Sequence, residues 1–393
     1  MNAPILLEQA WERLLALATP LGAETVPVDQ AAGRYLAADL LARRTQPARD
    51  LSAMDGFATA GPGPWRIVGE ARAGRPYAGA LAAAEAARIS TGAACPEGAE
   101  AIVPIEDATV AGEELRAPQP EPGRWIRSAG FDFASGTTVL EQGARIGPAQ
   151  IALARAAGHG TLEAARRPRV AIVECGDELV ADPAECPPEK LPSSNGAMVA
   201  AMAAGLGDVG RIGPLPDDRA ALARAFADAD DADVLVTTAG ASVGERDHVR
   251  GALEDCGASL AFWRVAIRPG KPLLVAKRGA QIVLGLPGNP ASAYVTAFLF
   301  LLPLLRTMQG AVRPLPAAIP LPLAAPLPAG GARREFVRAR FVNGLAEPLP
   351  ERDSSALLTL AAADLLIDRP IGAPEAASGA VVPCYWLENG GVA

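Results

Sequence analysis

The chain has 393 residues, of which half are apolar, 40 are Gly and 36 are Pro, a composition typical of a globular protein with many tight turns and not of a disordered one. Single cores usually stop growing near ~250–300 residues, so we expect several domains. Lys and Arg total 36 against 44 Asp and Glu, and the net charge of −8 excludes a general attraction to nucleic acid or to anionic membranes.

The N-terminus and the cysteines favour a cytoplasmic protein. Acidic residues interrupt the first apolar segment, which lacks the basic start and apolar core of a signal peptide. The longest apolar run, 291–305, is shorter than the ~20 residues that span a bilayer. Because it contains Pro303, it predicts a buried, kinked helix. Five cysteines with no C-x-x-C pair indicate neither a disulfide framework nor a thiolate zinc site, and favour a reducing compartment.

The first part of the chain predicts helices on either side of a β-rich segment. Residues 5–18 place apolar side chains at helical spacing and predict an amphipathic helix, and a second, short helix is expected over 29–41. Short β-like segments separated by turn residues follow over 62–136. A helix over 148–157, with a proline in its first turn, then returns the chain to the first layer.

Strands and helices alternate from 168 to 310, which predicts a parallel sheet covered by helices on both faces. The expected strands are RVAIV, DVLVTT, LAFWRVAI, PLLVAK and QIVLGL. The expected helices are NGAMVAAMAAGLG with Asn195 as N-cap, DDRAALARAFADA with an Asp cap, VRGALEDC, and a helix that begins at Pro290. The residues after 313 are Pro-rich and β-like, with one helix near 354–363, and form a further domain.

The loop GASVGERD, residues 240–247, lies between the strand DVLVTT and a helix. Ligands of open parallel sheets bind beyond the carboxyl ends of the strands, where this loop is expected. Its small residues would let backbone N–H groups approach a phosphate, and Glu245 and Asp247 are suited to a hard cation such as Mg²⁺. An equally supported alternative, from this loop alone, is a tight turn in which Asp247 only caps the helix.

Two catalytic motifs fit less well. GASVG matches the G-x-S-x-G nucleophile elbow, with Ser242 as nucleophile, but that fold needs a histidine well after the serine. The chain has only His159, which precedes Ser242, and His248, which lies on the same loop; this argues against a catalytic triad. The only GK dipeptide stands in PGKP, without the Ser or Thr that a Walker loop requires.

Three further loops, ECGDEL, RPGKP and GLPGNP, carry charged residues or glycine next to predicted strands. Each of them alone is compatible with an exposed turn. Glycine-rich loops that bring acids and bases to several ends of one sheet are difficult to explain as turns, so together they predict a phosphate-bearing ligand with Mg²⁺. The candidate binding residues are Asp177, Glu178, Arg268, Lys271, Pro287 and Asn289.

Six segments, in order along the chain, resemble the molybdopterin molybdenumtransferase family. They are SAMDGFA (52–58), ISTGAACPEGAEAIVPIED (89–107), GDEL (176–179), GASVGERD (240–247), IRPGKP (267–272) and GLPGNPASA (285–293). The resemblance implies a multidomain α/β protein. Its expected domains are a helical domain of residues 1–43 and 137–167, an inserted β-rich domain of 44–136, a doubly wound parallel-sheet nucleotide-binding domain of 168–312, and a β-barrel-like domain of 313–393.

The resemblance also implies a reaction in molybdenum cofactor biosynthesis, in which adenylyl-molybdopterin and molybdate give the molybdenum cofactor and AMP with the help of Mg²⁺. The catalytic residues implied are Asp55, Thr91, Asp132, Asp247 and Lys271. Those implied to bind the pterin substrate are Asp177, Glu178, Gly240, Ser242, Arg268, Pro287, Asn289, Arg338 and Ser354. The metal ligands implied are Asp177, Glu245 and Asp247.

In the family, Asp55, Thr91, Arg338 and Ser354 would line a cleft that faces the third domain of a partner subunit, so the resemblance implies a homodimer. A molybdopterin adenylyltransferase and molybdoenzymes are further possible partner proteins. Simpler alternatives remain for three of these residues: a turn at Asp55, a strand end at Thr91, and a helix cap at Ser354.

The sequence departs from the family pattern at several positions. Phe131 replaces one acid of an acid pair and leaves only Asp132; Glu174 and Cys175 stand where small hydroxyl residues are usual; Ala239 replaces a glycine. The charge of Glu174 would either replace a lost one or repel a phosphate. These changes indicate a divergent transferase or a paralogue with altered ligand choice.

Two other functions are compatible with parts of the sequence. One is a molybdopterin adenylyltransferase, but that enzyme would need only the 168–310 region and not the segment 52–58. The other is a non-catalytic dimeric molybdopterin-binding scaffold, like the related domains that cluster membrane receptors in animals. The sequence has no long disordered linker to support such assembly, and release of AMP would separate an enzyme from a scaffold.

Overall fold

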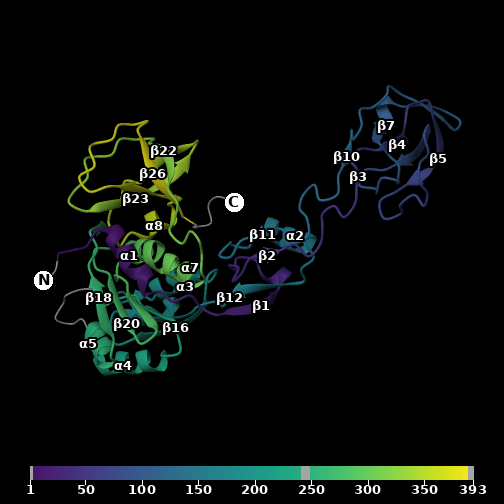
Figure 1. The fold of residues 1–393 in the computed structure, drawn as a ribbon. Helices are drawn as coiled ribbons and strands as arrows, with labels where there is room; N and C mark the ends of the chain where they lie inside the picture. Colours follow the sequence, from purple (N-terminus) through teal and green to yellow (C-terminus); the bar gives the residue numbers. More distant parts are fainter. Residues whose placement is uncertain (1–2, 240–247, 388–393) are drawn as a thin grey trace.

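A computed structural model describes residues 3–239 and 248–387, and Figure 1 shows their arrangement. Three six-stranded sheets carry most of the strand residues in this part of the chain. One is the central sheet of the 168–310 region, one lies in the C-terminal region above it, and one lies at the far end of an extended arm.

The central sheet has the strand order β16-β13-β17-β21-β20-β18. Its bounds are Arg169–Cys175 for β13, Asp208–Leu215 for β16, Val234–Thr237 for β17, Ser259–Trp263 for β18, Leu274–Arg278 for β20 and Gln281–Gly285 for β21. The first four strands of this order are parallel, but β20 pairs antiparallel with both β21 and β18, so β20 alone runs in the opposite direction and the prediction of a parallel sheet was wrong at this strand. Only two residues join β20 to β21, and Gly279 in this turn has φ +58°. So short a connection permits only an antiparallel pair, which explains the direction of β20.

Helices cover both faces of this sheet, as predicted. Even-numbered residues of β13 such as Ile172 belong to the core under α1 (Leu7–Leu17), α3 (Asn195–Ala203) and the helix that begins at Pro290. Odd-numbered residues such as Val173 pack against α4 (Arg219–Asp228) and α5 (His248–Asp255) on the other face. Burial on both faces explains why the strand RVAIV is apolar throughout.

The apolar helix after Pro290 is a core helix. It runs as α6 (Pro290–Thr296), a π-helical stretch (Ala297–Leu301) and α7 (Leu302–Met308). By length and composition this segment could span a membrane, but 89% of its apolar window is buried inside the protein. The π-helical stretch comes directly before Pro303, which has no N–H to donate. The prediction of a buried helix is confirmed.

Residues 1–43 and 137–167 do not form a helical domain. The predicted helix at 5–18 exists as α1, but it packs on the central sheet domain, where Trp11 donates from Nε1 to the carbonyl oxygen of Leu299 at 2.7 Å. The predicted helix at 29–41 was wrong: a 3-10 turn (Val28–Gln30) is followed by Gly33 at φ +79°, a conformation that ends a helix. The remaining helix of this region is α2, Pro148–Ala156.

Short strand pairs build the rest of this small module. β1 (Ala23–Pro27) pairs with β12 (Thr161–Ala165), and β2 (Leu40–Leu41) pairs with β11 (Thr138–Leu140). In Figure 1 the module lies between the central domain and the arm.

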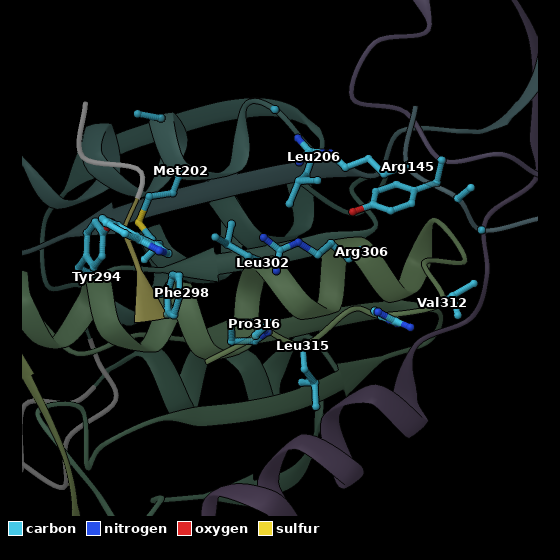
Figure 2. Close-up of a pocket in the computed structure, with 18 of the residues that line it drawn as sticks. Arg145, Met202, Leu206, Tyr294, Phe298, Leu302, Arg306, Val312, Leu315 and Pro316 are labelled. Atoms are coloured by element: carbon cyan, nitrogen blue, oxygen red, sulfur yellow. The ribbon is translucent and has the colours of Figure 1, made fainter. Parts of the chain in front are cut away.

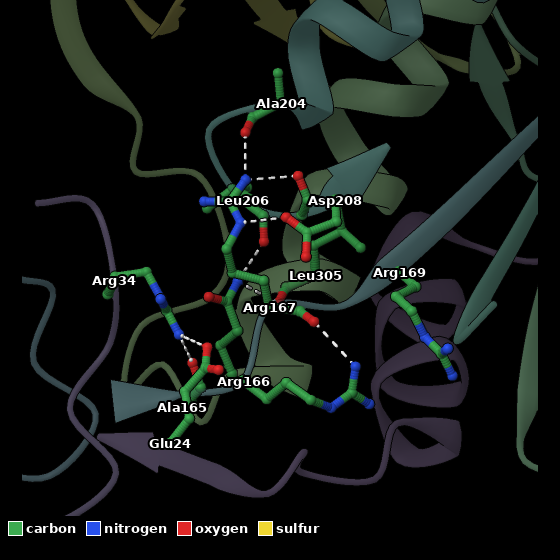
Figure 3. A network of polar contacts seen from close by, with 12 residues as sticks. Glu24, Arg34, Ala165, Arg166, Arg167, Arg169, Ala204, Leu206, Asp208 and Leu305 are labelled. Atoms are coloured by element: carbon green, nitrogen blue, oxygen red, sulfur yellow. Dashed lines mark hydrogen bonds and ion pairs between the residues drawn. The ribbon is translucent and has the colours of Figure 1, made fainter. Parts of the chain in front are cut away.

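Arginines fasten the small module to the edge of the central sheet (Figure 3). The Arg166 guanidinium forms two hydrogen bonds with the Asp233 carboxylate, at 2.8 and 2.9 Å. Arg167 donates to Asp208 at 2.8 Å and to the carbonyl oxygens of Ala204 and Gly207, both at 2.6 Å. The connection between the two modules is therefore held by bidentate and multiple charged hydrogen bonds, which have defined geometry.

The inserted segment is β-rich, as predicted. Its sheet has the order β7-β4-β6-β5-β9-β8. The strand bounds are Gly56–Ala60 (β4), Trp65–Ala71 (β5), Glu85–Ile89 (β6), Ala101–Pro104 (β7), Thr109–Ala111 (β8) and Glu114–Arg116 (β9), with β3 (Leu51–Ser52) and β10 (Ile126–Arg127) as a separate pair. This domain lies far from the central and C-terminal domains in Figure 1.

The C-terminal sheet has the order β19-β23-β25-β26-β22, with β24 on β23. Its strands are β19 (Ile267–Arg268), β22 (Ile319–Pro322), β23 (Arg334–Val342), β24 (Leu345–Pro348), β25 (Leu365–Arg369) and β26 (Val381–Trp386). A bridge between Leu323 and Ala346 brings the end of β22 beside β24, so these strands curve into a ring. The predicted helix near 354–363 is α8, Leu357–Ala361.

β19 shows that the predicted strand LAFWRVAI is in fact two. Arg264 has φ +69°, a left-handed conformation that interrupts a strand. The chain then leaves β18 and pairs in parallel with β23 of the C-terminal sheet, which places Arg268 opposite Glu335. The RPGKP segment therefore lies between the two domains.

Candidate functional site

Strands β13, β17 and β21 end at one edge of the central sheet. Val173 pairs with Thr237, and Thr237 pairs with Gly285, so the three parallel strands end side by side. This places the ECGDEL and GLPGNP segments, which follow β13 and β21, at the carboxyl edge, where ligands of such sheets bind. The predicted residues Gly240, Ser242, Glu245 and Asp247 lie outside the described residues.

Glu174 lies under this edge and is 1% exposed. Its carboxylate accepts hydrogen bonds from Ser193 Oγ at 2.5 Å, from the backbone N–H of Gly196 at 2.9 Å and from the Arg211 guanidinium at 2.7 Å. Burial alone would raise the pKa of Glu174, but the hydrogen bonds from Ser193, Arg211 and Gly196 outweigh it and lower the pKa. The charge is thus balanced inside the protein, at the first turn of α3.

The first residues of α3 reach toward the loop after β21. Ser194, not the predicted Asn195, is the N-cap position, because Asn195 is already the first residue of the helix. The Asn195 side chain donates from Nδ2 to the carbonyl oxygen of Gly288 at 2.6 Å. It therefore ties α3 to the GLPGNP loop, a contact that the sequence pattern did not suggest.

Asp177 and Glu178 are exposed at the same edge. Asp177 Oδ1 accepts a hydrogen bond from the backbone N–H of Asp217 at 3.1 Å. Among the described residues, no group of three or more His, Cys, Asp or Glu side chains could hold a metal ion. Of the three predicted Mg²⁺ ligands only Asp177 is described, and one exposed carboxylate is compatible with Mg²⁺, which keeps several water ligands in proteins.

A cleft of about 530 Å³ separates the central domain from the C-terminal domain. The central domain contributes Arg268, Pro269, Gly270, Lys271, Pro272, Pro287, Gly288, Asn289 and Ser292; the C-terminal domain contributes Arg333, Arg352, Asp353 and Ser354. The cleft therefore brings together five residues that the sequence pointed to separately: Arg268, Lys271, Pro287, Asn289 and Ser354.

Two hydrogen bonds join the walls of this cleft. Asn289 donates from Nδ2 to Ser354 Oγ at 2.8 Å, and the backbone N–H of Ala291 donates to the Ser354 carbonyl oxygen at 2.9 Å. The N-cap position of α8 is Ala356, so the alternative of Ser354 as a helix cap was wrong.

Four cationic side chains line the cleft. Arg268 forms an ion pair with Glu335 at 3.2 Å. Within residues 3–239 and 248–387, the side chains of Lys271, Arg333 and Arg352 form no hydrogen bond or ion pair. Such a concentration of cations is suited to a multiply charged anion. The sequence did not point to Arg333 or Arg352. Arg333 follows the glycines Gly330 and Gly331 but stands outside the predicted sheet loops, and the only local sign of Arg352 was its charge beside the predicted Ser354.

The RPGKP loop is held closely against α6. Gly270 has φ +102°, and a Cβ atom there would lie 2.7 Å from Cγ2 of Thr296. A side chain at this position would therefore displace the loop, and with it Arg268 and Lys271. The expectation that this loop follows the end of a sheet strand holds only in part, since it runs from β19 of one sheet into β20 of another.

Arg338 lies behind the cleft and is 4% exposed. Its guanidinium donates to the carbonyl oxygens of Glu351, Asp353 and Ala356 at 2.9, 2.8 and 3.1 Å. Burial lowers the pKa of Arg338. In this structure Arg338 shapes the loop that carries Arg352 and Ser354.

Asp55 and Thr91 meet in the inserted β domain, where Asp55 Oδ1 accepts a hydrogen bond from the Thr91 N–H at 2.7 Å. Asp132 is exposed near the start of the arm, next to Phe131, which is 72% exposed. In Figure 1 the inserted domain lies far from the central and C-terminal domains, and the cleft lies between the latter two. A single chain therefore does not bring Asp55 and Thr91 to the cleft.

A larger cavity, of about 820 Å³, lies elsewhere, between the small module, α3, the α6–α7 helix and Trp386. Figure 2 shows Met202, Leu206, Tyr294 and Phe298 among its lining. None of the residues predicted from sequence lines it. The arginines Arg145, Arg306 and Arg313 line this cavity, but none of the predicted loops at the carboxyl edge of the sheet does, so we assign the candidate site to the cleft and the adjoining sheet edge.

Comparison with known proteins gives three consecutive family matches. Residues 5–158 match the MoeA N-terminal region (domain I and II), residues 171–307 a probable molybdopterin binding domain, and residues 320–387 the MoeA C-terminal region (domain IV).

Curated relatives and solved structures agree with these matches. The molybdopterin molybdenumtransferase of Bacillus subtilis is 32% identical over 417 residues, which cover 99% of this chain and 96% of the relative. Molybdopterin molybdenumtransferase 2 of Mycobacterium tuberculosis is 35% identical and covers 90% of this chain and 93% of its own. A molybdopterin biosynthesis MoeA protein from Pyrococcus horikoshii has a TM-score of 0.79 at 27% identity, over 98% of this chain and 99% of that one.

Proposed function

Because this chain belongs to the molybdopterin molybdenumtransferase family, and is thus an enzyme of molybdenum cofactor biosynthesis, we propose that it transfers molybdenum from molybdate to adenylyl-molybdopterin and releases AMP with the help of Mg²⁺. The observation that carries the proposal is the cleft between the central and C-terminal domains, with four cations and the Asn289–Ser354 contact. Molybdate is a tetrahedral dianion, and a cleft of this charge suits it.

The adenylylated pterin would lie along the carboxyl edge of the central sheet. There Asp177 and Glu178 are exposed after β13, and Pro287 and Asn289 border the cleft. Gly240, Ser242, Glu245 and Asp247 would bind the same substrate. In this position the pterin's phosphates and the molybdate would share the cations Arg268 and Lys271. Arg338 would act through the loop of Ser354 that it holds.

The chain's residues would act mainly by positioning and charge. Breaking the phosphoanhydride bond separates AMP from the pterin phosphate, and cations fixed in advance stabilise the charge that develops. Lys271, in a loop fixed by Gly270, has the required pre-organisation. When bound, Mg²⁺ would supply further charge neutralisation at the phosphoanhydride, held by Asp177 together with Glu245 and Asp247.

A homodimer would complete the site. Asp55 and Thr91 belong to the inserted domain, which lies far from the central and C-terminal domains in Figure 1, whereas the cleft lies between those two domains. We infer that Asp55 and Thr91 act at the cleft of a partner subunit, together with Asp132. The proposal also includes a cytoplasmic location, exchange of substrate or product with a molybdopterin adenylyltransferase and molybdoenzymes, and the domain division at residues 43/44, 136/137, 167/168 and 312/313.

AMP release from adenylyl-molybdopterin tests the proposal. The purified protein is incubated with Mg²⁺, with and without molybdate, beside Asp177→Ala and Lys271→Gln. Lys277→Gln is a matched control, because Lys277 lies in β20 outside the cleft. We expect molybdate-dependent AMP release that falls in both site variants and not in the control. Tight binding of the pterin without turnover would instead support a molybdopterin-binding scaffold.

A further inference from the structure

Arg268 and Glu335 are neighbours across the boundary between two domains. They stand opposite each other in the parallel pairing of β19 with β23, and their side chains form the 3.2 Å ion pair. Arg268 lines the cleft, whereas Glu335 lines a smaller adjoining cavity of about 260 Å³. Among the described residues, Glu335 is the only carboxylate that forms an ion pair with a cation of the cleft, and it lies just outside the cleft.

Arg352 stands on the other wall and lines both cavities, like Arg268. The surrounding protein atoms lower the pKa of Arg352 by desolvation, Glu335 opposes this effect, and Arg268 adds repulsion. Arg352 therefore interacts electrostatically with both members of the Arg268–Glu335 pair. Its guanidinium has no ion-pair partner in the described chain, although such groups are costly to desolvate without one.

Glu335 is the internal counter-ion of this group of cations. Its side chain is 22% exposed, while that of Arg268 is 55% exposed, so the carboxylate is held by its strand and the arginine has room to turn into the cleft. An anion that binds Arg268 in the cleft must replace Glu335 as its ion-pair partner. An anion that binds Arg352 breaks no ion pair between described residues. Glu335 and Arg352 thus act on anion affinity in opposite directions.

We propose that Arg352 is a binding residue for a tetrahedral dianionic oxyanion in the cleft, and that Glu335 limits its affinity by competing with the anion for Arg268. The inference rests on the proposed function in one respect, the expectation that molybdate is the oxyanion. A phosphate group of the pterin or nucleotide has the same chemistry, and the two sources are distinguished by the choice of probe.

Calorimetric titration of the full chain with sodium molybdate, sulfate and AMP, each alone, measures binding without any turnover. For a free oxyanion we expect molybdate and sulfate to bind, Arg352→Gln to weaken both by roughly tenfold through loss of a charged hydrogen bond, and Glu335→Gln to tighten both by a few-fold. If the cleft serves a phosphate group, AMP responds to the two substitutions instead. Arg340→Gln is the matched control, because Arg340 is an exposed arginine of β23 outside both cavities.

Arg352→Lys keeps the charge and should retain most of the affinity if charge dominates. Denaturation curves of each variant show whether the fold is intact. The proposal is overturned if no probe binds the wild-type chain, if Arg352→Gln binds as the wild type does, or if Glu335→Gln weakens binding. AMP release by the wild type is measured separately, so a chain that binds oxyanions as described but lacks turnover would contradict the proposed function and leave this inference standing.

Discussion

The Asn289 side-chain amide donates a 2.8 Å hydrogen bond to the Ser354 hydroxyl, and this contact joins the loop after β21 to the loop before α8. The two residues are 65 positions apart in the sequence and belong to different domains. Together with the bond from the Ala291 N–H to the Ser354 carbonyl oxygen, the contact sets the distance between the two walls of the cleft.

This contact predicts an energetic coupling between the domains. Asn289→Ala and Ser354→Ala each remove one partner of the bond, and the double substitution removes both. We expect the single changes to be non-additive by about 1 kcal/mol in the free energy of unfolding, the usual net value of such a bond. Urea denaturation of the four proteins measures the coupling. Additive effects would show that the side-chain bond does not hold the walls together.

Glu174 predicts a loss of stability on neutralisation. Glu174→Gln keeps the size of the side chain but leaves Arg211 without its counter-ion and weakens the bonds from Ser193 and Gly196. We expect the free energy of unfolding to fall by about 1–3 kcal/mol. Glu178→Gln, a change at an exposed residue of the same loop, should alter it by less than about 0.5 kcal/mol. Equal effects of the two substitutions in urea denaturation would contradict the structural role of Glu174.

The connection between the small module and the central sheet predicts acid sensitivity. Burial alone would raise the pKa of Asp233, but hydrogen bonds from Arg166 and the Arg169 N–H outweigh it, so the pKa in the folded protein is below the ordinary value. A lowered pKa contributes stability that is present above the unfolded value of about 3.9 and is lost as pH falls through it toward the folded value.

Asp233→Asn should therefore be less stable than the wild type near neutral pH, and the difference should shrink as pH falls below about 4. Thermal denaturation between neutral pH and the acid limit of folding measures both proteins. Asp231→Asn is a suitable control, because the pair between Asp231 and Arg169 is largely exposed and such pairs contribute little. A difference that stays constant with pH would show that Asp233 stabilises the fold by other means than its charge.

Local sequence patterns predicted the existence of helices and strands better than the surfaces and strands against which they pack. The spacing of Leu7, Trp11, Leu14, Leu15 and Ala18 predicts α1, but an apolar stripe fits any apolar surface, so the sequence did not show that α1 packs on the central domain. Gly33 was a sign against the helix at 29–41 that the periodicity of the segment outweighed. The antiparallel place of β20 follows from its two-residue connection to β21, which the alternating pattern of strands and helices concealed.

The candidate site divides in the same way. Lys271, Pro287 and Asn289 stand in glycine-rich loops, which can be recognised from consecutive residues of the sequence. Arg333 and Arg352 come from a different domain, and only the pairing of β19 with β23 brings them opposite the RPGKP loop. The three donors around Glu174 come from two separate segments, 193–196 at the start of α3 and Arg211 in β16, so no local pattern could show whether the charge of Glu174 was balanced.

Subunit complementation is the sharpest test of the proposed dimer. Asp55 and Thr91 belong to the inserted domain, which in Figure 1 lies far from the central and C-terminal domains, and Lys271 lines the cleft between those two. A shared site would therefore take Asp55 and Thr91 from one chain and Lys271 from its partner. Thr91→Ala and Lys271→Gln should each abolish molybdate-dependent AMP release. Equal mixing of the two inactive variants, with subunit exchange, should restore about one quarter of the wild-type activity, because half of the dimers are mixed and each mixed dimer keeps one intact site.

Mixing Lys271→Gln with Asn289→Ala, which lies in the same cleft, should restore none, since both changes fall on the same half of a shared site. Full-strength activity of the isolated Thr91→Ala protein, or no recovery in the first mixture despite mixed dimers in solution, would show that the arm does not complete the cleft of a partner subunit.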